Sequence, residues 1–221
     1  MLTSDEFYTD AQRELQARHD SVKLANVVVQ AIVRDEIEAP HVPFIESRDF
    51  FFLSTVSAGG EPTVSYKGGA AGLVKVLDSR TLVFPNYDGN GMFKSMGNIS
   101  EAAKVGLLFI DMETPNRIRV QGNAKLSPED PELANYPGAN MLVRVDVTAC
   151  FLNCARYIHK HKRVSQSPYV PDDKGEQPFP SWKRIDMVQD ALPARDNGRA
   201  AAEGGTITFD GYVEKLMEGT S

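Results

Sequence analysis

The chain has 221 residues, of which 42% are hydrophobic and 24% charged, as is typical of a globular protein with a sizeable core. A formal net charge of −6 argues against a general nucleic-acid-binding role, and no apolar run reaches the roughly 18–20 residues that a membrane span needs. The two cysteines give no disulfide framework and the N-terminus has no signal-peptide pattern, so we expect a protein of the reducing cytoplasm.

Two helices are expected at the N-terminus. Apolar residues recur every four positions in the segment 4–18, which predicts an amphipathic helix. The segment 21–38 has a comparable apolar face and predicts a second helix, which ends before Pro40.

A series of short apolar or alternating segments follows, separated by turn residues. These segments predict strands at 50–56, 62–66, 73–77, 81–84, 105–110, 117–126 and 142–148. A helix is expected at 92–103 and a short one from Pro131. Most connections between the strands are too short to hold a helix, so the pattern predicts an antiparallel barrel rather than a parallel α/β sheet.

The C-terminal part is expected to be less regular. Residues 160–180 contain four prolines and predict an extended loop, and helical spacing returns at 182–192. We expect a mobile tail from residue 193, with a short helix near 212–217. The predicted division is an N-terminal helical segment at 1–43, a barrel at 44–160, and a C-terminal segment at 161–221 that packs on the barrel or a partner subunit.

Polar residues gather at the ends of the elements predicted between residues 64 and 98. They are Ser65, Lys67, Asn86, Asn90, Lys94, Ser95 and Asn98. Lysines and the N–H groups at a helix start are the groups that hold anions. Taken one at a time, these residues are better explained as a surface turn and a helix cap than as an anion site. Their closeness in the chain makes a joint anion site the better hypothesis.

Several other polar groups are open to two interpretations. Arg117 and Arg119 share one face of a predicted strand and face either a ligand or solvent. Cys150, Cys154 and the nearby histidines lack the spacing of a zinc site, so no metal is expected. The basic segment, residues 156–163, is either an anion patch or a solvated surface. No recognised catalytic motif is present, which fits a protein whose chemistry belongs to a cofactor.

The sequence resembles the pyridoxamine 5′-phosphate oxidase-like family of FMN-binding split barrels over residues 5–192. The segments that carry the resemblance are FIESRDFFFLSTV (44–56), PTVSYKGG (62–69), TLVFPNYDGNGMFKSMGNI (81–99), VGLLFID (105–111), RIRVQGNAKL (117–126) and NCARYIH (153–159). The resemblance implies a mainly β (α+β) fold, a six-stranded antiparallel split β-barrel with flanking helices. It also implies a homodimer that holds FMN between its subunits, with F420 or haem as alternative cofactors.

The resemblance also implies roles for individual residues. Those expected at the cofactor are Ser65, Tyr66, Lys67, Gly68, Asn90, Lys94, Ser95, Asn98, Arg117 and Trp182. Lys94 and Ser95 match the family's phosphate-binding pair, and Trp182 would reach the partner's flavin. Ser65 stands where the oxidases have an arginine, and their C-terminal arginine-x-histidine segment is not recognisable. We therefore expect an activity other than vitamin B6 oxidation.

The sequence thus predicts an FMN-dependent oxidoreductase that transfers a hydride through flavin N5 to or from an unidentified small molecule. One alternative is a non-catalytic flavin- or haem-binding storage or sensor protein. Another is an F420-dependent reductase, because the long acidic tail of F420 would suit the basic segment. Neither a nucleic acid nor a membrane is expected as a partner.

Overall fold

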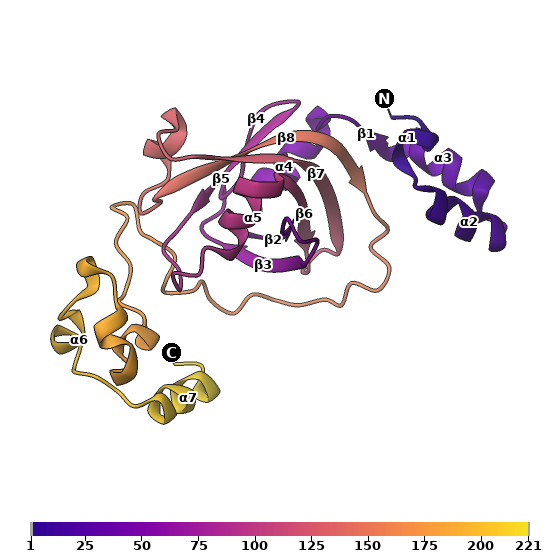
Figure 1. Ribbon diagram of the computed structural model, residues 1–221. Coiled ribbons are helices and arrows are strands. Elements are labelled where there is room, and N and C mark those ends of the chain that lie inside the picture. Colours follow the sequence, from indigo (N-terminus) through magenta and orange to yellow (C-terminus); the bar gives the residue numbers. More distant parts are fainter. Residues whose placement is uncertain (1, 221) are drawn as a thin grey trace. The chain divides into compact units, whose positions relative to one another are not determined.

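The structure, a computed structural model, describes residues 2–220, which form two compact units (Figure 1). The first unit contains the described residues up to Gln166 together with Asp172–Gly175, and the second contains Ser167–Pro171 and the described residues from Glu176 on. The three-part division expected from the sequence stays a prediction.

The N-terminal segment is more broken than the sequence predicts. Its elements are α1 (Ser4–Phe7), α2 (Asp10–Arg18), α3 (Val22–Ile32) and β1 (Val33–Arg34). The single helix expected at 4–18 is wrong, because Tyr8 is extended and Thr9 begins a new helix by accepting a hydrogen bond from the N–H of Gln12. The helix expected at 21–38 ends at Ile32, because the next two residues pair with β8.

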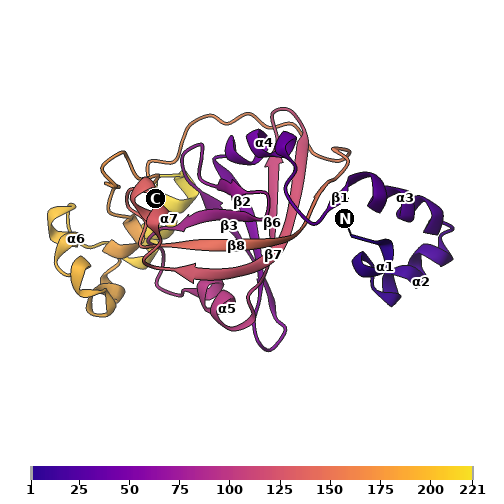
Figure 2. The ribbon, with the colours of Figure 1, turned by 90° about the horizontal axis from the view of Figure 1, so that it is seen from above.

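One antiparallel sheet forms the barrel (Figures 1 and 2). Its strands are β2 (Phe50–Val56), β3 (Pro62–Gly68), β4 (Lys75–Asp78), β5 (Thr81–Asn86), β6 (Lys104–Asp111), β7 (Asn116–Ser127) and β8 (Met141–Leu152). They follow the order β3-β2-β6-β7-β8-β5-β4, and β1 also pairs with β8. The predicted antiparallel split barrel with flanking helices is confirmed. The strand expected at 73–77 is observed as β4, so β2 to β8 correspond to the seven strands predicted from the pattern, and β1 is an additional two-residue strand.

Short helices flank the barrel. They are the 3₁₀ helices η1 (Ala39–His41) and η2 (Pro131–Asn135) and the α-helices α4 (Val42–Glu46) and α5 (Lys94–Ala102). The predicted short helix at Pro131 is confirmed as η2. Helix α5 begins two residues later than expected, because Phe93 adopts a left-handed conformation with φ 48°.

The core of the barrel follows from the alternation of its strands. On β2, Phe51 and Leu53 are fully buried, whereas the residues that alternate with them along the strand are only partly buried. The Phe51 ring contacts the rings of Phe84 and Phe109, at 5.0 and 5.5 Å between centroids. At Gly122, where the β7–β8 register shifts, an added Cβ would lie 2.6 Å from the Asp146 carbonyl oxygen.

The second unit consists of short helices. They are η3 (Ser181–Arg184), η4 (Asp186–Ala191), η5 (Ala194–Asp196), α6 (Arg199–Ala202) and α7 (Phe209–Glu218). Helix α7 confirms the short helix expected near 212–217, and the helix expected at 182–192 is replaced by 3₁₀ turns. The mobility expected for the tail from residue 193 stays a prediction; within this unit Ile185 and Ile207 form a parallel bridge. Within residues 2–220, no helix is both long and apolar enough to cross a membrane.

Candidate cofactor-binding site

The strand β3 divides the predicted site residues between its two sides. Ser65 and Lys67 lie opposite the buried residues Leu53 and Phe51 of β2, so they share the side that faces the barrel interior. Tyr66 and Gly68 alternate with them and face outward. Because β3 is the first strand in the sheet order, one row of its backbone N–H and C=O groups is left for a ligand or another chain.

The start of helix α5 lies next to the inner side of β3. The hydroxyl oxygens of Ser65 and Ser95 are 3.2 Å apart. Among residues 2–220 no side chain caps the helix at Phe93, so the first N–H groups of α5 have no side-chain acceptor there. The two predicted parts of the anion site, the strand and the helix start, therefore meet at this contact.

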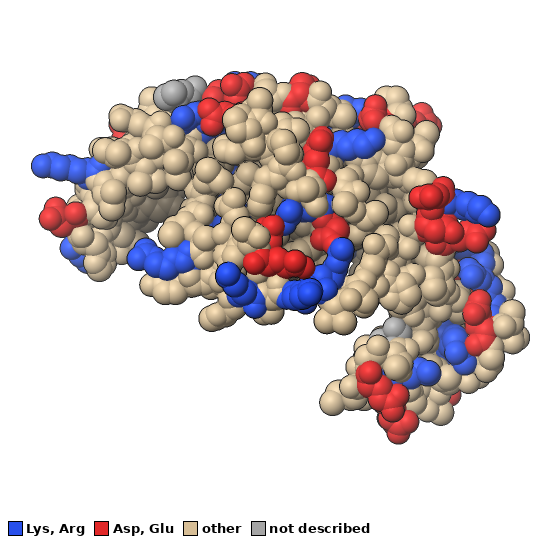
Figure 3. All heavy atoms as spheres, turned by 180° about the vertical axis from the view of Figure 1, so that it is seen from behind, with Lys and Arg blue, Asp and Glu red and all other residues tan. Residues whose placement is uncertain are grey.

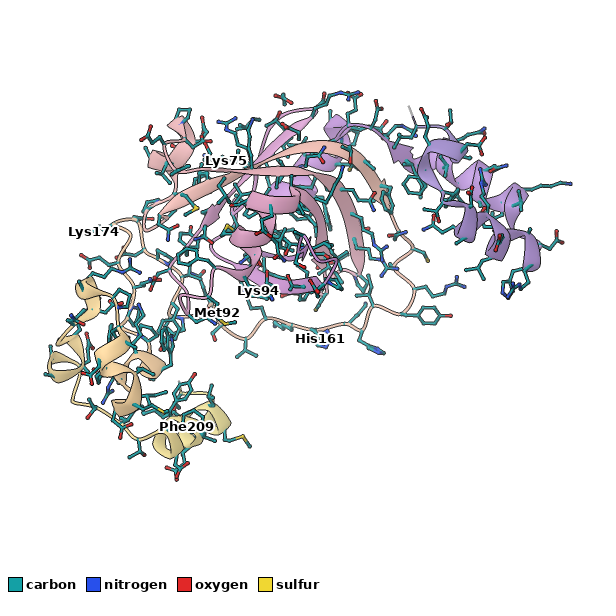
Figure 4. The ribbon with its side chains drawn as sticks, viewed as in Figure 1. Lys75, Met92, Lys94, His161, Lys174 and Phe209 are labelled. Carbon is teal, nitrogen blue, oxygen red and sulfur yellow. The ribbon has the colours of Figure 1, made fainter. Side chains whose placement is uncertain are left out.

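Two lysines add positive charge to this region, and Figure 4 labels Lys94 at the beginning of α5. Lys67 is half-buried, and this burial lowers the pKa of its ammonium group. Lys94 is exposed. The pKa of the Glu61 carboxyl is lowered first by a hydrogen bond from Ser57, and the charge of Lys94 lowers it further. Across residues 2–220, neither lysine side chain has a hydrogen bond or an ion pair. Both ammonium groups are therefore available to an anion.

Asn98 is the most buried of the predicted site residues. Its amide donates a hydrogen bond of 2.9 Å to the hydroxyl of Thr55, which lies 2.8 Å from the hydroxyl of Thr63. Thr55 is only 1% exposed. Asn98 thus attaches α5 to the β2–β3 hairpin. Sequence reasoning missed both threonines, although Thr55 is a polar residue in the inward alternation of β2 and could have been noticed.

Asn90 shapes the loop that leads into α5. Its side-chain oxygen accepts a hydrogen bond of 3.1 Å from the N–H of Met92, and its amide nitrogen lies 3.4 Å from the Met92 sulfur. These contacts fix the local turn two residues before the helix, so Asn90 acts on the loop rather than on β3.

The outer face of β3 carries an aromatic shelf formed by Phe50, Phe52 and Tyr66. The Tyr66 ring stacks on Phe50 with centroids 5.3 Å apart and an angle of 15°, and meets Phe52 edge-on at 5.9 Å. Tyr66 is 62% exposed and its neighbour Val64 is 70% exposed. A Cβ at Gly68 would lie 2.7 Å from the Tyr66 ring, so a glycine is needed for the ring to take this position. The shelf is a flat apolar surface open to a ligand or a second subunit.

Arg117 lies on the same outer surface but does not reach β3. Strands β2 and β6 separate β7 from β3 in the sheet order. One terminal nitrogen of Arg117 donates a hydrogen bond of 2.9 Å to the carbonyl oxygen of Cys154. Its Nε is buried and has no partner among the described residues.

The remaining candidates belong to other elements of the chain. Trp182 belongs to the second unit, where the Lys183 ammonium lies 5.7 Å from its ring centroid, and its approach to a flavin stays a prediction. Cys150 is buried, and this burial raises the pKa of its thiol to about 12. Within the described part of the chain, no group of three or more His, Cys, Asp or Glu side chains could hold a metal ion.

Comparison with known proteins gives one family and several related folds. The family profile described as pyridoxamine 5′-phosphate oxidase matches residues 37–164, more than half of the chain. No curated protein sequence matches this chain.

Three solved structures illustrate the related folds. A protein from Lactobacillus delbrueckii, assigned provisionally as a pyridoxamine 5′-phosphate oxidase, is 24% identical over 53% of this chain and 95% of its own, with a TM-score of 0.44. An FMN-binding protein from Syntrophomonas wolfei is 11% identical over 64% and 97%, with a TM-score of 0.41. The haem storage protein HutZ from Vibrio cholerae is 19% identical over 52% and 94%, with a TM-score of 0.40.

Proposed function

The chain belongs to the pyridoxamine 5′-phosphate oxidase family, and from that premise we propose that it is an FMN-binding oxidoreductase that acts on a small molecule. The observation that carries the proposal is the contact between β3 and α5. There an uncapped helix start and two serine hydroxyls meet, and Lys67 and Lys94, which have no anionic partner among the described residues, lie within two positions of these serines in the chain.

These residues suit a phosphate group. The helix start offers backbone N–H groups and a partial positive charge, and the hydroxyls of Ser65 and Ser95 can donate to phosphate oxygens. Lys67 is half-buried, so its unpaired charge is costly until an anion binds. We assign Lys67, Lys94, Ser65 and Ser95 to the phosphate of FMN. Because the grip is built on two lysines and two hydroxyls, we expect a reaction other than vitamin B6 oxidation.

The ring of FMN would lie along the edge of β3. The open backbone groups of this edge match the donors and acceptors on the polar end of a flavin ring. The aromatic shelf provides an apolar surface beside that edge, and Arg117 keeps a buried donor on the same outer surface. Bound FMN would supply hydride transfer at its N5 position. The protein would supply position and positive charge.

The same outer surface supports a homodimer. Val64 and Tyr66 are largely exposed, and a contiguous apolar patch of this kind is typical of an interface. A dimer would cover the open edge of β3 and exclude water from the ring. Light scattering on the purified chain tests this. A dimer that a Val64→Glu substitution dissociates supports the proposal, and a monomer in the presence of FMN contradicts it.

A non-catalytic flavin- or haem-binding protein is the second candidate. It is favoured by the aromatic shelf, because a flat apolar surface takes any broad planar ring and performs no proton transfer by itself. An F420-dependent reductase would use the same edge of β3. The two cysteines are free, and the cytoplasmic location expected from the sequence stays a prediction.

Colour and titration test the proposal. The purified protein should absorb at about 450 nm, as oxidised flavins do, or should bind added FMN. Parallel titrations with FMN, F420 and haemin then compare the three cofactors. Tight binding of haemin with no affinity for FMN would contradict the proposal. Turnover of a reduced nicotinamide with a defined acceptor would separate the enzyme from the storage protein.

A further inference from the structure

The proposed cofactor site does not use the basic segment, residues 156–163. Residues 153–166 contain four lysines or arginines, two histidines and no acidic residue, in a chain whose net charge is −6. All six of these basic side chains are exposed. They lie on the long connection that leaves β8 and runs along the barrel in Figure 1, and Figure 4 labels His161 on it.

The beginning of the basic segment is fixed to the barrel by a side chain and a turn. A terminal nitrogen of Arg117 donates to the carbonyl oxygen of Cys154 at 2.9 Å, and the N–H of Ile158 closes a turn on the carbonyl oxygen of Ala155 at 3.0 Å. Tyr157 has φ 74° within this turn, a left-handed conformation that is unfavourable for a residue with a side chain. The surrounding contacts therefore hold a specific chain path.

The end of the basic segment is fixed by the β6–β7 turn. The N–H of His161 donates to the carbonyl oxygen of Met112 at 3.0 Å, and the N–H of Arg163 donates to the Glu113 carboxylate at 3.2 Å. The Arg163 guanidinium pairs with Asp49. A segment held at both ends presents its charges in a preset arrangement, which lowers the entropy cost of binding a ligand.

Most of this positive charge is not neutralised within the chain. Only Arg163 has an acidic partner, and within residues 2–220 no carboxylate lies at ion-pair distance from Arg156, Lys160 or Lys162. Like charges on one short segment repel each other, and a ligand with several negative groups would relieve this repulsion. Figure 3 shows lysine and arginine side chains gathered at the lower edge of the barrel, with a few acidic ones between them.

The basic segment connects two parts of the candidate cofactor site. It begins at Arg117 and ends at Asp49, whose carbonyl oxygen accepts a hydrogen bond of 2.8 Å from the N–H of Gly69 at the end of β3. We propose that the basic segment binds a ligand with two or more carboxylate or phosphate groups, and that this ligand is the anionic part of the substrate. The role as substrate rests on the proposed function, whereas the binding itself does not.

Calorimetric titration of the full-length protein tests the binding. The probes are inorganic tripolyphosphate and citrate, which separate a preference for phosphate from one for carboxylate. We expect at least one of them to bind, and binding to weaken when sodium chloride rises from about 50 to about 500 mM. In the double variant Lys160→Glu/Lys162→Glu, affinity should fall by about ten-fold or more, because two charge-assisted contacts are reversed.

A matched variant controls for net charge. Lys23→Glu/Lys104→Glu makes the same charge change on exposed residues elsewhere, since Lys23 lies on α3 and Lys104 starts β6, at the opposite end of that strand from the Met112 turn. This variant should bind the probes as the wild type does. Equal losses in both variants, no loss in either, or no binding of either probe would overturn the proposal.

Titrations of protein saturated with FMN separate this inference from the proposed function. Binding of a probe that FMN does not displace identifies a second site for a separate anionic substrate. Displacement by FMN, together with loss of probe binding in Lys67→Ala/Lys94→Ala, would place the probe at the cofactor phosphate site and overturn the inference. If the chain binds a probe at the basic segment but no FMN, the proposed function fails while the anion site stands.

Discussion

Lys183 in the second unit and Lys67 in the barrel are both lysines withdrawn from water, but their surroundings differ. The Lys183 ammonium lies 2.8 Å from the Asp196 carboxylate, and the two side chains are 5% and 3% exposed. The Phe179 and Trp182 rings lie 5.9 and 5.7 Å from the same ammonium. Lys67, by contrast, has neither a hydrogen bond nor an ion pair among the described residues.

The difference separates charges that hold the structure from charges that await a ligand. A buried ion pair organises its surroundings because neither partner can be removed without leaving a bare charge. A half-buried charge with no partner in its own chain is a cost that an external anion can offset. The contrast predicts that substitutions in the two regions will damage different properties: stability in one, and cofactor binding in the other.

The largest effect is expected at the buried pair. Lys183→Met should lower the free energy of unfolding of the second unit by about 3 kcal/mol, because Asp196 would keep only the more distant Arg195 and Arg199. Trp182 is the only tryptophan of the chain, so its fluorescence during denaturant unfolding reports on this unit. The double variant Lys183→Met/Asp196→Leu should recover most of the loss. If Lys183→Met leaves the free energy of unfolding unchanged, the ion pair does not stabilise the second unit.

The next effect should appear in cofactor affinity. Lys67→Ala and Lys94→Ala should each weaken FMN binding by about 1.5–3 kcal/mol, the usual worth of a hydrogen bond to a charged group. Neither should destabilise the protein without FMN, because neither lysine has a partner to lose. Fluorescence titration with FMN and thermal unfolding measure the two properties. Lys23→Ala is the control and should change neither. Unaltered affinity in both site variants would mean that the phosphate lies elsewhere.

A smaller loss of stability is expected at Asn98. Asn98→Ala removes the hydrogen bond to Thr55, while Thr55 and Thr63 keep their contact with each other. We expect a cost of about 1–2 kcal/mol in unfolding free energy. FMN affinity should fall less than in the lysine variants, because Asn98 acts by holding α5 in place. A loss of affinity as large as that of Lys94→Ala, without a change in stability, would instead assign Asn98 to the ligand.

The last prediction concerns Asp130 and the pH dependence of stability. Hydrogen bonds from Arg144, at 2.5 and 2.8 Å, hold the pKa of the buried Asp130 carboxyl well below its usual value of 3.8. Because the pKa is lower in the folded state, this stabilisation is complete above the unfolded pKa and is lost as the pH falls below it. Asp130→Asn should therefore flatten the pH dependence of the melting temperature below about pH 4. If the melting temperature of the variant falls with pH in acid as steeply as that of the wild type, Asp130 is not the group responsible.

Sequence reasoning predicted the barrel well because its strands carry a strong signal. The predicted strand at 50–56 coincides with β2, where alternate residues are buried. The helix break near Tyr8 has a local signal that was overlooked, the capping box of Thr9 and Gln12. The break after Ile32 could not be predicted from local pattern, because it depends on pairing with β8, which lies more than 100 residues away in the chain. The ion pair between Lys183 and Asp196 in the second unit could not be predicted either, because the sequence does not show which charged residues will be buried together.

The candidate site was predicted in part. The sequence indicated that the start of α5 and the end of β3 belong together, and the Ser65–Ser95 contact joins them. It did not indicate that Asn98 would turn inward to Thr55, since that depends on which face of α5 packs on β2. Nor could it predict that the basic segment would end against Asp49, because this ion pair is formed across 114 residues.

Riboflavin, which lacks the phosphate of FMN, shows whether Lys67 and Lys94 hold that phosphate. Fluorescence titrations of the wild type and of Lys67→Ala/Lys94→Ala with both ligands give the contribution of the phosphate in each protein. We expect the wild type to bind FMN at least about 100-fold more tightly than riboflavin, and the double variant to lose most of this preference. A double variant that retains the full preference for FMN would contradict this assignment.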